Sequence, residues 1–176
     1  MRNTVVGCLL FAACVSAQWE SPRVIAANGA CGICENNGWS IAAVENRVHA
    51  VYWGWWIVEH PRACHRRSLD TGVVWDSFPQ LLSDDTAYTD LHLSVCASGL
   101  NVHLVHERAD TSQEAIVYTR STDGGVNWGS EYRLVQGTGE YTRPCIACEG
   151  QSVHAVWEDS RGAVFYRRSQ DGGTVW

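Results

Sequence analysis

Short apolar runs rich in β-branched and aromatic residues follow one another along most of the 176-residue chain, and Gly, Asn or Asp interrupts them. This pattern is typical of short β-strands joined by tight turns. None of the runs keeps the 3.6-residue spacing of an amphipathic helix. The sequence therefore predicts an all-β fold of about one ordinary domain in length.

Three segments carry the form Val-His-x-Val followed by a residue with a ring: NRVHAVYW, LNVHLVHE and QSVHAVWE. Their histidines, His49, His103 and His154, occupy one equivalent strand position. An active site uses a residue once, whereas a scaffold uses it in every repeat. We therefore expect these histidines to be structural, although histidine is a common acid/base group.

A second motif, Ser-x-Asp-x-Gly-x-x-Trp, follows each of these segments, and its Asp positions are 53 and 48 residues apart. The short Ser and Asp side chains can accept bonds from backbone N–H groups inside a turn. The Gly can adopt positive φ, and the Trp is expected to begin the next strand and to pack under the turn. The motif thus predicts a self-capped hairpin turn with a structural role. Its members are Ser68, Asp70, Gly72 and Trp75, then Ser121, Asp123, Gly125 and Trp128, then Ser169, Asp171, Gly173 and Trp176.

Each repeat of roughly 50 residues contains four expected antiparallel strands, which is typical of one blade of a β-propeller. Residues 18–176 are therefore predicted to form a partial β-propeller of about three four-stranded blades. Propellers close with about four to eight blades. We accordingly expect the chain to be the N-terminal part of a longer propeller.

Residues 1–17 have the pattern of a secretory signal, with Arg2 before an apolar run and Val15-Ser16-Ala17 resembling a cleavage site. An alternative is a lipoprotein signal, because Phe11 to Cys14 resembles a bacterial lipobox and would place a lipid anchor on Cys14. Either interpretation predicts a secreted, periplasmic or cell-surface protein. No later segment is apolar enough for a transmembrane span.

Six of the eight cysteines lie beyond the signal, and an even number in an oxidising compartment favours disulfides. Two Cys-x-x-Cys pairs leave three alternatives open: a shared zinc site, local or cross-blade disulfides, or small buried thiols. The pairs lack the interval of a zinc ribbon, so we expect no metal and no other cofactor. The six are Cys31, Cys34, Cys64, Cys96, Cys145 and Cys148.

Acidic residues outnumber basic ones by 19 to 13, giving a net charge of −6 without any basic stretch. This balance argues against a nucleic-acid partner. The nine Trp residues indicate repeated packing positions or surfaces on which sugar rings stack.

The Ser-x-Asp-x-Gly-x-x-Trp motif resembles the Asp box, or BNR repeat, of sialidases and related secreted β-propellers. The resemblance covers Trp39 to Trp176 and implies the propeller fold, but Asp boxes also occur in propellers that are not sialidases. It implies for a sialidase three Arg that hold the substrate carboxylate, a Tyr nucleophile activated by a Glu, and an Asp acid/base. The chain departs from this pattern, because the family's aromatic-Arg-Ile-Pro motif is replaced by Ser21-Pro22-Arg23-Val24.

Several residues are candidates for ligand contact. Arg143-Pro144 resembles a fragment of the arginine motif, with Glu140 and Tyr141 beside it. Asp159 and Arg161 lie in a loop after a Val-His-x-Val strand, where propeller loops line the ligand face, although a solvated charged loop is the plainer alternative. Strand alternation places Trp53 and Trp55 on one face, either to stack on sugars or to fill space between blades.

These observations support two classes of function. The first is a secreted repeat protein that binds glycans or cell-surface proteins without a catalytic set of its own. The second is an exo-sialidase-type glycoside hydrolase whose remaining catalytic blades are not in this sequence. The repetitive character of the strong motifs favours the first, and a purely structural adhesion module is a third alternative.

Overall fold

The protein is represented by a computed structural model that describes residues 22, 24, 31–32, 40–54, 62–83, 89–109, 114–137 and 139–176. The predicted signal, residues 1–17 with Cys14, lies outside the described residues, and so do Cys34, Trp55 and Trp56. All regular secondary structure in the described part is β-strand, which confirms the all-β prediction.

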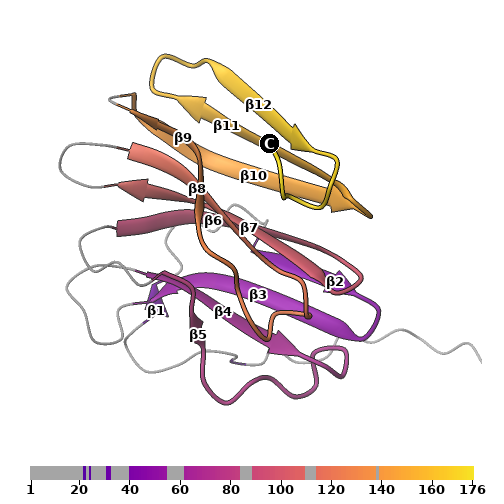
Figure 1. Cartoon of the computed structure of the whole chain (residues 1–176). Helices are drawn as coiled ribbons and strands as arrows, with labels where there is room; N and C mark the ends of the chain where they lie inside the picture. The colour runs from indigo at the N-terminus through magenta and orange to yellow at the C-terminus, as the bar shows by residue number, and fades with distance from the viewer. Residues whose placement is uncertain are drawn as a thin grey trace, which may run out of the picture.

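The strands form three antiparallel sheets that follow one another in chain order (Figure 1). The second sheet is a four-stranded meander, as predicted for one blade, and the third has three strands within the described residues. The first sheet contains five strands. Its first two, β1 and β2, both pair with β3, β1 near the end of β3 and β2 near its start, so together they take the place of one strand. Their bounds are β1 Cys31–Gly32, β2 Ile41–Val44, β3 Arg47–Gly54, β4 Arg62–Ser68, β5 Gln80–Leu81, β6 Thr89–Ser98, β7 Asn101–Ala109, β8 Glu114–Ser121, β9 Tyr132–Gly137, β10 Tyr141–Glu149, β11 Ser152–Asp159 and β12 Val164–Ser169.

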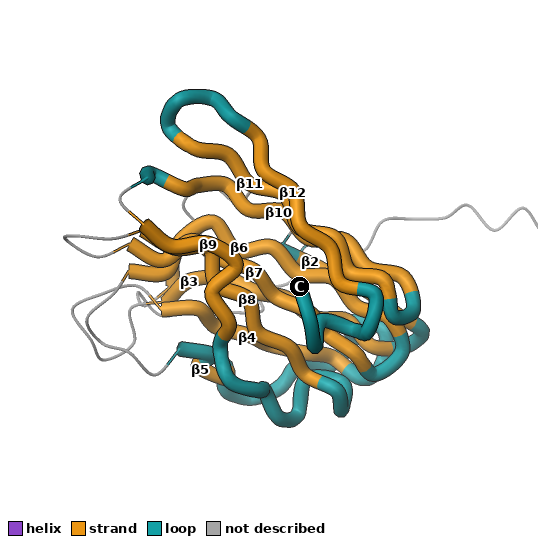
Figure 2. The backbone as a smooth tube through the Cα atoms, turned by 45° about the horizontal axis from the view of Figure 1, so that its top comes forward, coloured by secondary structure: helices purple, strands orange, loops and turns teal. Residues whose placement is uncertain are grey.

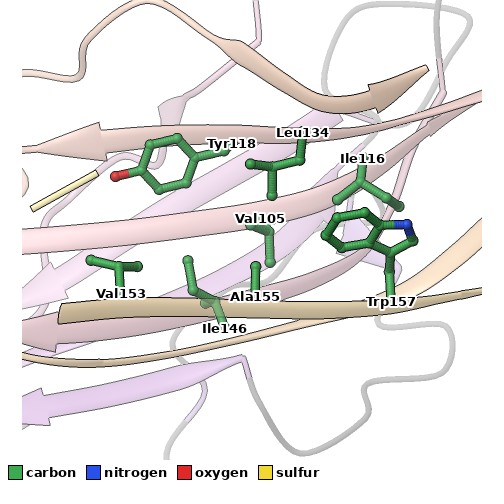
Figure 3. Close-up of a cluster of buried hydrophobic side chains, with 8 residues drawn as sticks. All are labelled: Val105, Ile116, Tyr118, Leu134, Ile146, Val153, Ala155 and Trp157. Atoms are coloured by element: carbon green, nitrogen blue, oxygen red, sulfur yellow. The ribbon is translucent and has the colours of Figure 1, made fainter. Parts of the chain in front are cut away.

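Two apolar layers separate the three sheets. The first lies between sheets one and two and includes Val51, Trp53 and Leu104. The second lies between sheets two and three, where Tyr118, Leu134, Ile116 and Val105 face side chains of β10 and β11 (Figure 3). Burial of these faces is the main favourable term that holds the sheets together.

The first strands of the sheets lie side by side, and serine side chains connect them. The Ser94 hydroxyl on β6 accepts a hydrogen bond from the backbone N–H of Ile146 on β10 at 3.1 Å. The Ser98 hydroxyl accepts one from Gly150 N–H at 2.9 Å. β6 and β10 therefore run parallel to each other in a fixed register.

The three Ser-x-Asp-x-Gly-x-x-Trp turns, here called the first, second and third box, share one hydrogen-bond scheme. In the second box, the Ser121 hydroxyl donates to Asp123 Oδ1 at 2.7 Å and accepts from Gly125 N–H at 2.9 Å. Asp123 Oδ1 also accepts from the N–H groups of Val126 and Asn127. These bonds, led by the one from Asn127 N–H, lower the pKa of Asp123 to about 2.

Loss of the box hydroxyl should destabilise the fold. Ser121→Ala is expected to reduce the free energy of unfolding by about 1–2 kcal/mol, because the buried N–H of Gly125 loses its acceptor. Thr122→Ala, which changes the exposed neighbour, should be close to neutral. Urea unfolding of the two variants measures the difference, and equal midpoints would show that the hydroxyl does not cap the turn.

Trp128 of the second box does not begin the fourth strand of its sheet, contrary to the expectation from sequence, whereas Trp75 of the first box forms an antiparallel β-bridge with Ser68. β9 starts at Tyr132, four residues after Trp128, although Gly129 N–H still bonds to the Arg120 carbonyl at 2.8 Å. The physical reason is that the ring of Trp128 turns toward the preceding sheet, where it meets His65 edge to face at 5.1 Å between centroids.

Each sheet has a pair of stacked rings, and in sheets one and two the box of the next sheet packs on this pair. In sheet two, His103 Nδ1 lies 2.8 Å from the Tyr118 hydroxyl, and the rings stack. Gly173 of the third box lies against the Tyr118 ring, and Trp176 meets that ring edge to face at 4.8 Å. Figure 2 shows the C-terminal segment, which is this box, curling back toward sheet two. We call such a pair the ring platform.

Sheet one has the same arrangement with a histidine in place of the tyrosine. His49 Nδ1 and His65 Nε2 are 3.1 Å apart, and Gly125 of the second box packs on them. An arginine also bonds the second and the third box, since Arg67 and Arg120 donate to the carbonyls of Gly124 and Gly172. The platform of sheet three, His154 with Tyr166, has the same 2.8 Å contact and is exposed. His49 and His103, two of the three recurring histidines, therefore lie in the contacts that hold neighbouring sheets together.

His65→Tyr should reduce the sensitivity of the protein to mild acid. Burial lowers the pKa of His49 to about 4 and that of His65 to about 3. Below about pH 6.5 the two histidines are protonated in the unfolded chain but stay neutral in the folded state. The free energy of unfolding therefore falls as the pH drops from about 6.5 toward the pKa values of the folded state. Replacing His65 should reduce the slope of unfolding free energy against pH by up to about 1.4 kcal/mol per pH unit.

Thermal melts between pH 7 and pH 4 would measure this slope. His65→Phe is the matched variant, because it also removes the titration but leaves His49 Nδ1 without the hydroxyl that Tyr supplies. It should show the same reduced slope with lower stability at pH 7. A slope that neither variant changes would contradict the role of the pair.

Candidate functional site

The strand ends that lie away from the boxes form the candidate site, here called the far end. Gly124 N–H and Gly172 N–H bond to the carbonyls of Leu100 and Gln151, which places both boxes beside the turns that follow β6 and β10. The far end therefore contains the start of β6 and β10, the end of β7 and β11, and the loop after β11.

Three of the candidate ligand residues meet at the far end of sheet three. The register of β10 and β11 pairs Tyr141 with Asp159 and Thr142 with Glu158, so Arg143, Asp159 and Arg161 all lie at this end of the sheet. Arg143 bonds to Glu158 and Arg161 bonds to Asp159, and these consecutive β11 residues point to opposite faces of the sheet. The side chains of Arg143 and Arg161 are 62% and 81% exposed. Two accessible guanidinium groups thus share one strand end.

Asp159 holds the loop in which Arg161 lies. Its Oδ1 accepts the backbone N–H groups of Arg161 and Ala163, both at 3.0 Å. Its Oδ2 accepts the guanidinium of Arg161 at 2.9 and 2.7 Å, and this bond is the main cause of the lowered pKa of Asp159. The buried carboxylate therefore orients Arg161, and the exposed guanidinium is the group that a ligand would reach.

Arg143 occupies a β-bulge that recurs in sheet two. Its φ is 52°, and His92 at the same position of β6 has a φ of 47°. Each donates to a glutamate on the next strand: Arg143 Nη1 to Glu158 at 2.6 Å, and His92 Nδ1 contacts Glu107 at 2.7 Å. A left-handed non-glycine residue is strained and is common beside functional sites.

Trp53 lies apart from this cluster. It is 9% exposed and packs in the apolar layer between sheets one and two, in the manner of the space-filling alternative. Its expected companion on the same face, Trp55, lies outside the described residues. Sugar stacking by this pair stays a prediction.

A buried ionic cluster that the sequence analysis did not identify lies between sheets one and two. Arg108 donates from Nε to Asp90 at 3.0 Å and from both terminal nitrogens to Glu131. His106 Nδ1 is 3.3 Å from Asp90. Asp90 also accepts from the Ser83 hydroxyl and from Ala63 N–H, so the cluster joins the two sheets.

A signal for this cluster was present in the sequence. His106 and Arg108 lie where the other repeats have Tyr52 or Trp157 and Gly54 or Asp159, so they break the repeat. Burial raises the pKa of Asp90, but His106, Arg108 and Ser83 outweigh it and hold the pKa well below its usual range. Asp90, His106 and Arg108 are too buried to meet a ligand directly, whereas Glu131 is exposed. Their contacts fix the far ends of β6 and β7.

Tyr141, Glu114 and Glu140, which lie near the two arginines, make structural contacts. Tyr141 meets Phe165 edge to face at 6.0 Å, and its backbone N–H bonds to the Glu114 carboxylate. Partial burial, with Glu107 and Glu140 nearby, raises the pKa of Glu114. The carbonyl of Glu140 accepts from Ser160 N–H, which fixes the loop that contains Arg161.

Among the described residues, no three His, Cys, Asp or Glu side chains are arranged as a metal site. The shared zinc site, one of the three alternatives left open for the cysteines, would need Cys34, which is outside this part of the chain. Within the same described ranges, no helix has the length and hydropathy to cross a bilayer.

Comparison with known proteins adds little to this geometry. No protein-family model matches the chain, and no curated protein matches it in sequence. One solved structure that matches is the Trypanosoma rangeli sialidase in complex with the inhibitor DANA, with a TM-score of 0.41 and 9% identity. The alignment covers 78% of this chain and 36% of that sialidase chain. A likeness at this level assigns neither activity nor ligand to the protein.

Proposed function

We propose that this protein is a secreted Asp-box repeat protein of the partial β-propeller type that binds an anionic glycan, or an acidic protein surface, at the far end of sheet three. One observation carries the proposal. Arg143 and Arg161 are exposed at one strand end, and buried or half-buried carboxylates hold their orientation. Preoriented guanidinium groups suit carboxylate or sulfate recognition, because their remaining N–H donors face solvent in fixed directions.

The export part of the proposal rests on the apolar segment before Gln18. Its test is the N-terminal sequence of the protein recovered from the medium of a secreting host. A start at Gln18 supports secretion, and a lipidated Cys14 supports a cell-surface anchor. An intact N-terminus on protein that stays in the cytosol would overturn export.

Binding is tested with the full chain on an array of sialylated, sulfated and neutral glycans, and with immobilised acidic peptides. Arg143→Ala and Arg161→Ala should each weaken binding by tenfold or more. Arg168→Ala is the matched control, because Arg168 is exposed on the same sheet near the box end. Binding that all three changes weaken equally, or that none weakens, would contradict a site at the far end.

An exo-sialidase is the second candidate, supported by the Arg pair and by Tyr141, which lies close enough to Arg161 to interact with it electrostatically. Release of a fluorophore from a sialoside by the full chain tests it. Activity that Tyr141→Phe abolishes would replace the binding proposal with a hydrolase. Glycan binding without turnover would exclude catalysis by this chain.

A further inference from the structure

Two cysteine side chains from different sheets face each other in the second apolar layer. Cys96 lies on β6 of sheet two, and Cys148 lies on β10 of sheet three. Both are half-buried thiols that pack against the cluster containing Ile146 and Val153. Their side chains are hydrogen-bond partners, so the two sulfur atoms are neighbours.

The register of the parallel strands places these thiols opposite each other. Ser94 bonds to residue 146 and Ser98 bonds to residue 150, so the offset between the strands is 52 residues at both points. Cys96 is midway between the serines, and the same offset leads to Cys148. Ser94, Cys96 and Ser98 share one face of β6 because side chains alternate along a strand.

Cys145 and Cys64 are in poorer positions to form a disulfide. Cys145 and Cys148 are three residues apart in a regular part of β10, so their Cα atoms are separated by about 10 Å. A disulfide requires Cα atoms within about 7 Å, which excludes a local bridge in this Cys-x-x-Cys pair. Cys145 also alternates away from the face that Ile146 and Cys148 present to sheet two, and Cys64 lies in sheet one, where its thiol donates to the Arg62 carbonyl.

We propose that Cys96 and Cys148 form a disulfide that joins sheets two and three, through exchange with a disulfide-containing oxidant such as oxidised glutathione. The Cys148 thiolate attacks one sulfur of the oxidant, and the first oxidant thiol leaves. Cys96 then loses its proton and attacks the Cys148 sulfur of the mixed disulfide, and the second oxidant thiol leaves. Two protein thiols are oxidised, and one oxidant disulfide is reduced to two thiols.

The hydrogen bond between the thiols favours this order of steps. It lowers the pKa of Cys148 and, together with burial, raises the pKa of Cys96. The thiolate is the attacking species, so Cys148 reacts first and Cys96 resolves the mixed disulfide. This inference does not depend on the ligand proposed above.

The test uses the full chain, equilibrated in oxidised glutathione, alkylated and digested with trypsin. A disulfide-linked pair of peptides, residues 68–108 and 134–161, is expected by mass spectrometry. The second peptide contains both Cys145 and Cys148, so variants separate them. The link should persist in Cys145→Ser and disappear in Cys148→Ser and Cys96→Ser.

Thermal melting is a second measurement, which distinguishes a disulfide formed in the folded protein from one formed in misfolded chains. Oxidation should raise Tm by roughly 5–15 °C in wild type and in Cys145→Ser, because the bridge closes a long loop. Oxidation should not raise Tm in Cys148→Ser. A link that survives in Cys148→Ser, a link that lowers Tm, or no link in the folded oxidised chain would each overturn the proposal.

Discussion

Gly173→Ala is expected to reduce the free energy of unfolding by roughly 2–5 kcal/mol, with a corresponding fall in Tm. Two independent costs add. Gly173 has a φ of 83°, where an L side chain is strained by roughly 1–2 kcal/mol. A Cβ at this position would also collide with the buried Tyr118 hydroxyl, and overpacking of that kind costs roughly 1–3 kcal/mol.

Two further variants separate these costs. Gly99→Ala is the control for backbone strain, because Gly99 has a φ of 59° and no heavy atom within 4 Å of an added Cβ. It should cost only about 1–2 kcal/mol. Tyr118→Phe removes the hydroxyl, so the effect of Gly173→Ala should be smaller in that background. Urea unfolding of wild type, Gly173→Ala, Tyr118→Phe and the double variant measures the coupling. Strict additivity of the two changes would show that the box does not pack on the platform.

Asp90→Asn should reduce the free energy of unfolding by about 3–5 kcal/mol. The substitution retains the shape of the side chain but leaves Arg108 and His106 in a buried cluster with one carboxylate fewer. Removal of one member of a buried charged group costs this much because the remaining charges have lost their solvation without compensation. Folding lowers the pKa of Asp90, so below about pH 4 the carboxylate of the unfolded chain takes up a proton while the folded one stays ionised. The contribution of Asp90 to the free energy of unfolding should therefore decrease as the pH falls below about 4.

Asp76→Asn is the matched comparison. Asp76 pairs with Arg67 Nε at 3.2 Å, and its side chain is 40% exposed. A surface pair contributes about 0–1 kcal/mol. Denaturant unfolding at pH 7 and at pH 3 should therefore separate the two variants strongly at pH 7 and less at pH 3. Similar losses at pH 7 would contradict a structural role for the buried cluster.

The sequence was informative where the chemistry is local and repeated. Ser121, Asp123 and Gly125 lie within five residues, and their donors, acceptor and positive φ belong to one turn. The all-β class and the succession of antiparallel sheets follow from the same repetition, because each unit must bury its faces against a neighbour. The recurrence of His103 likewise indicated a scaffold residue before its contact with Tyr118 was visible.

The contacts between units could not be predicted in the same way. Asp90 meets Ala63 only after two sheets have stacked, and no local spacing encodes that approach. Side-chain alternation along β3 predicted on which face of the strand Trp53 lies. It could not predict whether another sheet or solvent covers that face. Arg143 and Arg161 were recognised as charged loop or strand-end residues, whereas the carboxylates that orient them depend on strand pairing.

The ring platform has a consequence for how such a chain can arise. A box and the platform beneath it belong to neighbouring units. One unit therefore supplies a box for one contact and a platform for another, but neither contact lies within a single unit. Tandem duplication of the gene segment would copy both halves at once and create a new matched contact at the junction. Sheet one has His65 where the other platforms have tyrosine, and the glycine that packs above it is the same, so the contact accepts a change of ring.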